Sequence, residues 1–233
     1  MNVSSLQPAE TAPLAAHLDA AEAAALRVRM VKSQLQTVGL FTLDLIDAFE
    51  RTPREPHVPA HLAGLAYADA ALEVAPGRFL LEPMVLALLF ERAGLAAGDR
   101  VLVVGAATGY SAAVAAACGA VVTALENDPA LLPLLHAAAQ AAGYTVAEGP
   151  LTEGWAAGAP YSLILFEGAI EHIPPVIAAQ LAPAGRVAAV MRVAGVGHAA
   201  AGPLVVGKIA SPAFLEVAAR PLPGFARPRS FAF

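Results

Sequence analysis

The long uncharged stretch from Val101 to Leu125 constrains the fold of this chain more than any other feature. It opens with the apolar run Val101–Val104, which suits a strand buried on both faces, as in a parallel sheet. Gly105, Gly109 and Gly119 then interrupt it, so the pattern predicts a strand, a tight turn, a buried helix and a second strand. The stretch is also long enough to span a bilayer, but its glycines favour the folded interpretation.

Apolar strand patterns alternate with helical patterns along most of the chain. Helices are expected at residues 14–38, 43–51, 83–93, 111–117, 131–142 and 174–181, strands at 101–104, 121–125, 163–166 and 186–191, and an irregular, ordered loop region at 54–83. Segments 204–209, 215–219 and 230–233 look like antiparallel strands at one edge. Such alternation implies right-handed crossovers and a mainly parallel sheet. The predicted fold is α/β: a Rossmann-like, doubly wound sheet with antiparallel C-terminal edge strands and an N-terminal helical and loop extension.

The length favours one domain of ordinary size. We expect a flexible tail over residues 1–13 and a single domain over 14–233, in which 14–97 form the N-terminal extension and 98–233 the core and C-terminal strands. The N-terminus carries acidic residues and prolines where a signal peptide needs a basic start and an apolar block. The single cysteine, Cys118, indicates a reducing, cytoplasmic setting.

The charge balance argues against nucleic acid as the main partner. The chain has 19 acidic and 14 basic residues and a net charge of -5, whereas a phosphate backbone is bound by clustered Lys and Arg. His57 and His61 are four residues apart, but Pro59 between them prevents the helical geometry of a metal pair. The sequence therefore predicts no metal site, no nucleic acid and no membrane insertion, and it leaves the oligomeric state open.

The strongest candidate for a binding site is the turn after the first apolar strand, Gly105 to Tyr110. Its glycines let the backbone turn tightly and let a ligand approach with no Cβ in the way, and a helix N-terminus adds free N–H groups. Glu126 ends the next strand about 20 residues later, where a carboxylate can accept both ribose hydroxyls of a nucleoside. Tyr110 stands where the dinucleotide fingerprint has glycine, which disfavours NAD or FAD. An ordinary buried turn is the alternative interpretation.

Motifs beyond the turn extend this pattern. In chain order they are Met30-Val31-x-x-Gln34-Leu35, Pro53-Arg54-Glu55, Val58-Pro59, Ala66-Tyr67-x-Asp69, Gly77, Pro83, Ala159-Pro160-Tyr161, Ile173-Pro174, Gln180-Leu181 and Gly185-Arg186. Their order and spacing, from about residue 28 to 192, resemble the protein-L-isoaspartate O-methyltransferase family. Methyltransferases of this layered fold use Gly-x-Gly-x-Gly in the turn, and this chain has Ala107 at the middle position.

The resemblance implies a cofactor, a product and a substrate. The cofactor is S-adenosylmethionine, the product S-adenosylhomocysteine, and the substrate a carboxylate of an isoaspartyl residue in a peptide or protein, or else a different or apolar substrate. The implied cofactor-binding residues are Gly105, Ala106, Ala107, Thr108, Gly109, Tyr110, Glu126, Asn127, Pro150 and Leu151, and the implied substrate loop is Arg78, Phe79, Leu80, Leu81 and Glu82.

This chain departs from the family pattern at several site positions. The family's loop Gly-Gln-Thr-Ile-Ser-x-Pro is Gly77-Arg78-Phe79-Leu80-Leu81-Glu82-Pro83 here, so Phe79 and Leu81 replace both hydroxyl groups. Val103 replaces an acidic residue before the turn, Gly149-Pro150-Leu151 replaces the Gly-Asp-Gly adenine segment, and Ser162 replaces an Asp. The small Thr-Ala segment is Glu167-Gly168-Ala169. No catalytic residue is therefore assigned.

These departures bear on both the reaction and the cofactor. A carboxylate is already ionised near neutral pH, so its methylation needs no general base and depends on holding nucleophile and methyl group in line. Phe79 and Leu81 remove that positioning. Two lost polar contacts at about 1 kcal/mol each would weaken cofactor binding on the order of thirtyfold. We expect a methyltransferase with weak or absent isoaspartyl activity; the alternative is an inactive relative that serves as a nucleoside- or protein-binding module.

Five further side chains have two interpretations each. Arg78 could bind a substrate carboxylate through a fork of two hydrogen bonds, or be a solvated loop arginine. Glu82 and Glu167 could line the pocket mouth, although surface carboxylates are the simpler interpretation. His172 could be an acid or base for a hydroxyl substrate, or an ordinary residue of the loop before Pro174. Trp155 could stack on a bound ring or belong to the core. Phe79, Leu80 and Leu81 together could form a hydrophobic lid.

Overall fold

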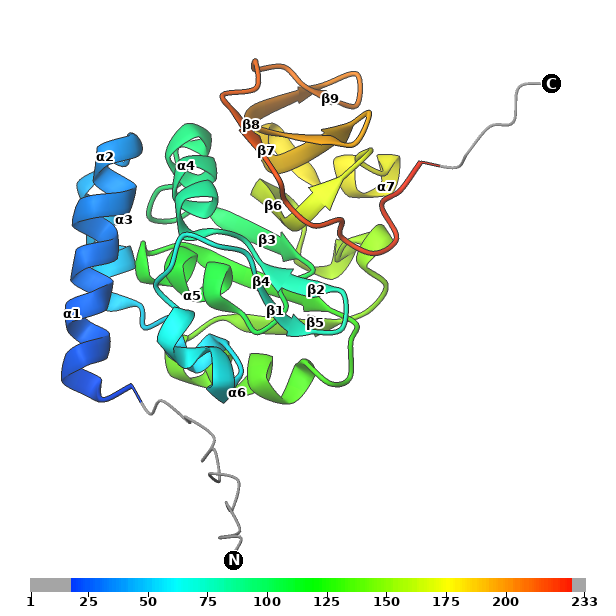
Figure 1. Ribbon diagram of the computed structural model, residues 1–233. Helices are drawn as coiled ribbons and strands as arrows, with labels where there is room; N and C mark the ends of the chain where they lie inside the picture. Colours follow the sequence, from blue (N-terminus) through cyan, green and yellow to red (C-terminus); the bar gives the residue numbers. More distant parts are fainter. Residues whose placement is uncertain (1–17, 228–233) are drawn as a thin grey trace, which may run out of the picture.

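A computed structural model describes residues 18–227 of the chain (Figure 1). None of the helices in this part is long and apolar enough to cross a membrane. The expected tail 1–13, residues 14–17 of the first expected helix and the expected strand 230–233 lie outside the described residues. The expected division at residue 97 stays a prediction.

The centre of the molecule is a mainly parallel sheet with the strand order β10-β8-β7-β6-β3-β4-β5, to which β9 adds by pairing with β8. The strands are β3 (Arg100–Val104), β4 (Val121–Glu126), β5 (Thr145–Glu148), β6 (Tyr161–Ile170), β7 (Leu181–Val193), β8 (Val196–Val205), β9 (Lys208–Ile209) and β10 (Leu215–Val217). Strands β5, β4, β3, β6 and β7 are parallel, and β8, β9 and β10 are antiparallel. The predicted α/β class and antiparallel edge are confirmed.

The central strand β3 contributes to two cores. Val101 and Val103 belong to a cluster on one face of the sheet, and Leu102 and Val104 to a cluster on the other; all four are fully buried. Because both faces are covered, the strand is apolar at every position after Arg100 and does not alternate with polar residues. The chain runs outward from β3 to β4 and β5 and then returns to β6, so the sheet reverses its winding between β3 and β6, where ligands of such folds bind.

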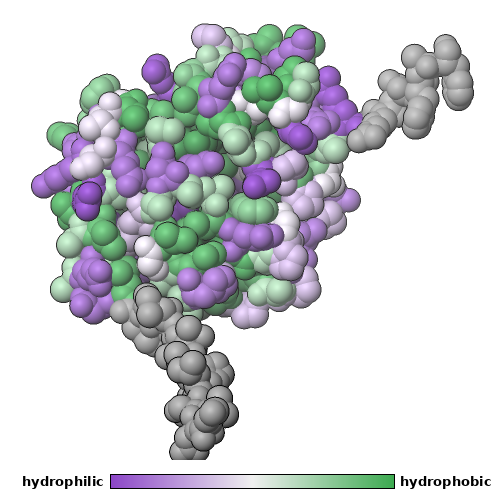
Figure 2. All heavy atoms as spheres, in the orientation of Figure 1, coloured by the Kyte–Doolittle hydropathy of each residue, from purple (hydrophilic) through white to green (hydrophobic). Residues whose placement is uncertain are grey.

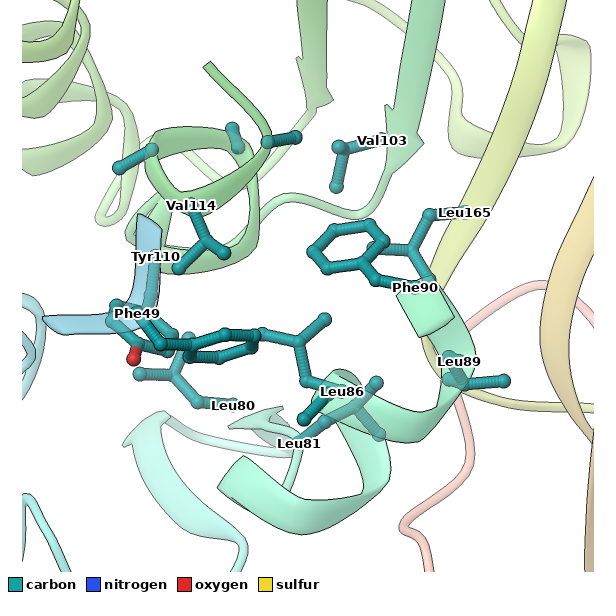
Figure 3. Packing of buried hydrophobic residues seen from close by; sticks show 14 of the residues in the cluster. Phe49, Leu80, Leu81, Leu86, Leu89, Phe90, Val103, Tyr110, Val114 and Leu165 are labelled. Carbon is teal, nitrogen blue, oxygen red and sulfur yellow. The ribbon is translucent and has the colours of Figure 1, made fainter. Parts of the chain in front are cut away.

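Helices on the first face come from both halves of the chain. They are α1 (Ala20–Met30), the π-helical turn Val31–Leu35, α2 (Gln36–Val38), α3 (Leu43–Arg51), α4 (Pro83–Ala93), α5 (Tyr110–Ala117) and α6 (Leu132–Ala142). Asp19 caps α1 by accepting a hydrogen bond from the Glu22 N–H, and Gly39, at φ 120°, ends α2. In Figure 3, Phe90 of α4 lies beside Val103 and Leu165, while Phe49 lies near Tyr110.

The second face has a thinner cover. A short helix, α7 (Pro175–Ala178), the 3₁₀ turn Leu151–Glu153 and the C-terminal residues Leu222 and Phe225 pack there. The C-terminal segment, red in Figure 1, is joined to the sheet by an isolated bridge between Ala169 and Pro221. On the face drawn in Figure 2, apolar and polar side chains are interspersed, in keeping with a chain that is 58% hydrophobic.

The segment 54–83 is more regular than predicted. It contains 3₁₀ turns at Glu55–His57 and Ala60–Leu65 and a hairpin of β1 (Leu72–Ala75) and β2 (Arg78–Leu80). Its Pro and Gly residues obscure the strand pattern, yet Gly77, at φ 71°, is what the hairpin turn requires.

Other secondary-structure expectations were inexact. Edge strand β5 was missed because it is short and half-polar. The helix expected at 174–181 is only α7, because Leu181 already pairs with Tyr161 in the sheet. Strands β6 and β7 are longer than the expected 163–166 and 186–191. The single strand expected at 204–209 is instead the end of β8, a turn at residues 206–207 and β9.

Phe90→Ala tests the core of the first face. Phe90 is fully buried, so truncation should lower the free energy of unfolding by about 3–5 kcal/mol. Phe41→Ala is the matched control: Phe41 is 73% exposed, and its loss should change stability by roughly 0.5 kcal/mol or less. Urea denaturation measures both. Equal losses for the two variants would contradict this description of the core.

Candidate cofactor site

The turn between β3 and α5 lies at the carboxyl end of the sheet, where the sequence predicted a binding site. Gly105 and Gly109 have φ values of 72° and 87°, and Ala107 has a φ of 52°. Glycine adopts such angles freely, whereas Ala107 is strained there by roughly 1–2 kcal/mol. The residues from Val101 to Ala115 are all buried. The turn therefore has the expected shape, but it is covered.

Glu126 lies beside this turn at the end of β4 and is fully buried. Its carboxylate accepts hydrogen bonds from the backbone N–H groups of Ala107 (2.8 Å), Asn127 (2.8 Å) and Asp128 (3.0 Å). These three bonds fix the carboxylate at the place where the spacing predicted a ribose partner. The predicted position of Glu126 at the end of the strand is confirmed, and its role as a ribose partner stays a prediction.

Arg78 saturates the acceptor capacity of Glu126. Its Nη1 and Nη2 donate to Oε1 and Oε2 of Glu126, each at 2.6 Å, and Nη2 also donates to the Gly105 carbonyl oxygen at 3.0 Å. A carboxylate has about four lone-pair sites, and Glu126 here meets two guanidinium nitrogens and three backbone N–H groups. Arg78 is only 5% exposed, so it is neither a solvated loop arginine nor free for a substrate carboxylate.

Leu222 covers the glycine that a ligand would approach. A methyl group on Gly105 would come within 2.6 Å of Cδ1 of Leu222, so the space left by the missing side chain is filled from within the protein. Backbone hydrogen bonds hold the C-terminal segment in place: the Ala169 N–H donates to the Arg220 carbonyl oxygen, and the Leu222 N–H to that of Ala169, both at 2.8 Å.

Only a small gap remains between the hairpin, the end of β6 and the C-terminal segment. It is lined by residues including Arg78, Leu81, Glu167 and Leu222 and has a volume of about 10 Å³. That is near the lower limit for a single water molecule, whereas pockets for cofactor-sized ligands have roughly 300–1,000 Å³. The site is closed in this conformation.

The loop that follows Arg78 is part of the core. Leu80 and Leu81 are buried, and Figure 3 shows both among the packed side chains of the first face. Phe79 is half-buried, with the Arg220 guanidinium 5.5 Å from its ring centre. The hydrophobic lid expected from Phe79–Leu81 is therefore wrong for the two leucines, because they face inward.

Glu167 is not the surface carboxylate that we expected. It is 2% exposed, and its Oε1 accepts a hydrogen bond from the Leu81 N–H at 2.9 Å. Burial raises the pKa of Glu167, against the opposing effects of the Ser111 hydroxyl, the Leu81 N–H and the charges of Arg54 and Arg78. Glu82 is half-buried. A buried carboxyl group thus lies beside the loop where the substrate was expected.

No functional role was predicted for Arg54, although the structure places it at the centre of this region. Arg54 is fully buried; its Nη2 donates to the Leu81 carbonyl oxygen at 2.8 Å, and its guanidinium lies 4.5 Å from the ring centre of Tyr110. The only available signal was its place in a family motif. Arg54 ties the Pro53–Glu55 segment to the substrate loop and the turn.

The other expected site residues are more scattered. Asn127 and Pro150 are exposed, and Leu151 is buried. Trp155 is half-buried, and its ring lies against Gly149. It therefore packs on the protein beside the segment that was expected to hold the adenine ring. His172 lies in the loop between β6 and α7, and no contact described for residues 18–227 joins it to Glu126. The cofactor roles of these residues stay a prediction.

Comparison with known proteins decides the family. Residues 27–198 match the family described as protein-L-isoaspartate(D-aspartate) O-methyltransferase (PCMT). The chain belongs to this family. The protein-L-isoaspartate O-methyltransferase of Methylorubrum extorquens (strain PA1) is 42% identical over 183 residues, which cover 77% of this chain and 79% of the relative. That of Methylorubrum populi is 40% identical over 164 residues, 70% of this chain and 77% of the relative.

Solved structures agree with the fold. A structure described as a protein-L-isoaspartate O-methyltransferase of Plasmodium falciparum, in complex with S-adenosyl-L-homocysteine, matches with a TM-score of 0.71 at 15% identity, over 84% of this chain and 97% of that one. The PCMT family depends on S-adenosylmethionine. In the conformation described here, Arg78 binds Glu126 and Leu222 covers Gly105, so two of the residues predicted to bind the cofactor are occupied by the protein's own side chains.

His57 closes the turn from the other side. Its Nδ1–H donates to the Thr108 carbonyl oxygen at 2.8 Å, and the Thr108 hydroxyl donates to the His57 carbonyl oxygen at 2.6 Å. Burial is the main cause that lowers the pKa of His57 from 6.5 to about 4. His57 is therefore neutral in the folded protein at neutral pH, with the proton on Nδ1.

This lowered pKa predicts a pH dependence of stability. Between pH 6.5 and 4 the unfolded chain binds a proton at His57 that the folded protein does not, so stability present above pH 6.5 is lost as the pH falls. The full loss is about 3 kcal/mol. His57→Gln should remove this part of the pH dependence, and His61→Gln, at an exposed position, should not. Denaturation curves over this range test it; parallel curves for wild type and His57→Gln would contradict the assignment.

Proposed function

We propose that the chain is a divergent S-adenosylmethionine-dependent methyltransferase of the protein-L-isoaspartate type whose isoaspartyl activity is weak or absent. Membership of the family supports the reaction class. One observation carries the proposal of weak isoaspartyl activity: the loop that offers two hydroxyl groups in the family has Phe79 and Leu81 here, and Leu81 is buried in the core.

The chemistry of the substrate explains why this matters. Carboxylate methylation depends on holding the nucleophile in line with the methyl group, and hydrogen-bond donors do this for a carboxylate. Here the N–H of Leu81 already donates to Glu167, and the buried Glu167 lies beside the loop. A substrate carboxylate would meet apolar side chains and a competing carboxyl group. An apolar or uncharged acceptor suits this region better.

A second candidate is a catalytically inactive relative that binds a nucleoside or a protein. The observation that favours it is that Arg78 already binds Glu126, the predicted ribose partner, with two hydrogen bonds of 2.6 Å.

We propose a cytoplasmic location on the basis of the single, buried, unpaired cysteine, Cys118. Proteins with isoaspartyl residues are the substrates of the family, and a peptide or protein partner is proposed on that basis.

Calorimetry and a methyl-transfer assay separate these candidates. We expect this chain to bind S-adenosylhomocysteine on the order of thirtyfold more weakly than a relative that keeps the family's Gly-Asp-Gly segment and loop hydroxyl groups, the positive control. Transfer of labelled methyl groups from S-adenosylmethionine to an isoaspartyl peptide should stay near background. Transfer at the rate of the relative would contradict weak activity. If neither S-adenosylmethionine nor S-adenosylhomocysteine binds at millimolar concentration, the inactive relative is the better description.

A further inference from the structure

Arg78 is the residue that most directly opposes a cofactor in this site. It lies at the start of β2, and the family's loop pattern has glutamine at this position. A guanidinium group presents a rigid fork of donors that matches a carboxylate in a bidentate pair, which a glutamine amide does not. An arginine in place of glutamine therefore puts a side chain well suited to bind a carboxylate within hydrogen-bonding distance of Glu126.

Arg78 and Glu126 form an ion pair that is almost completely buried. Glu126 is 0% exposed and Arg78 5%, so water does not screen their attraction. Breaking a buried pair by removing one partner leaves an uncompensated charge. The hydroxyls of a ribose are neutral donors, so only the charge of the carboxylate would strengthen their hydrogen bonds to Glu126, whereas Arg78 adds an opposite charge and a bidentate fork. A ribose thus competes for Glu126 at a disadvantage.

The C-terminal segment reinforces this arrangement. Leu222 covers Gly105, which also accepts a hydrogen bond from Arg78, and Arg220 stacks on Phe79, the neighbour of Arg78. This segment lies beyond residue 198, where the match to the family ends. Two parts of the chain therefore close the site: Arg78, which replaces the glutamine of the family loop, and the C-terminal segment, which lies outside the residues that match the family.

We propose that Arg78 sets the affinity of this chain for its cofactor, because it occupies Glu126 as an internal competitor until the β1–β2 hairpin withdraws. This inference rests on the methyltransferase function proposed above. Apparent affinity falls in proportion to the fraction of molecules whose site is open. Weak binding then follows from the closed state as well as from the lost contacts of the adenine segment.

The test is Arg78→Gln, which restores the family residue. The variant should bind S-adenosylhomocysteine about tenfold or more tightly than the wild type, because Glu126 and the turn become accessible. Isothermal titration calorimetry of the full chain measures both affinities. Arg78→Lys keeps a positive charge without the bidentate fork and should fall between them. Arg186→Gln is the matched control: it breaks an ion pair of 2.6 Å with Asp99, at the opposite end of the parallel strands, and should leave the affinity unchanged.

The binding results distinguish a failure of the Arg78 proposal from a failure of the methyltransferase proposal. If wild type and Arg78→Gln bind equally weakly, the role of Arg78 is contradicted while the methyltransferase stands. If neither binds, both proposals fall. Should Arg78→Gln not fold, as judged by circular dichroism, Leu222→Ala uncovers Gly105 without leaving a charge unpaired. It should tighten binding about threefold or more, and no change in its affinity would overturn the closed-site account.

Discussion

The buried ion pair between Arg78 and Glu126 determines how the carboxyl end of the sheet is used. Glu126 is held by three backbone N–H groups at the position proposed to bind a nucleoside, and a charged carboxylate there requires compensation once water is excluded. Arg78 supplies it. The hairpin that carries Arg78 is thereby fixed over the turn, and the loop after it is directed into the core.

Several residues that differ from the family pattern pack together around the Arg78–Glu126 ion pair. With Arg78 on Glu126, the second hydroxyl position of the family loop lies in the core, where Leu81 suits the surroundings better than a polar residue. Glu167 replaces a small residue and accepts the Leu81 N–H, while Leu222 fills the space above Gly105. The same backbone framework that binds a cofactor in the family is therefore packed with this chain's own side chains.

The sequence predicted the framework well because its signals are local. The apolar run Val101–Val104, the glycine turn and Glu126 fixed the order of strand, turn, helix and strand, and α3 and α4 were predicted with their bounds. The occupant of the site could not be predicted in this way, because Arg78 and Glu126 are 48 residues apart and Leu222 lies in a segment with no periodic pattern. One signal was available: an arginine between apolar residues of a sparsely charged chain requires an anionic partner if it is buried.

A double-mutant cycle tests the ion pair most directly, without any cofactor. Free energies of unfolding from urea denaturation are compared for the wild type, Arg78→Gln, Glu126→Gln and the double variant. Each single change should lower stability by about 3–5 kcal/mol, and the double variant should lose little more than either one, because the second change removes a charge already left unpaired. Losses that simply add would show that Arg78 and Glu126 do not interact, and the site would then not be closed as described.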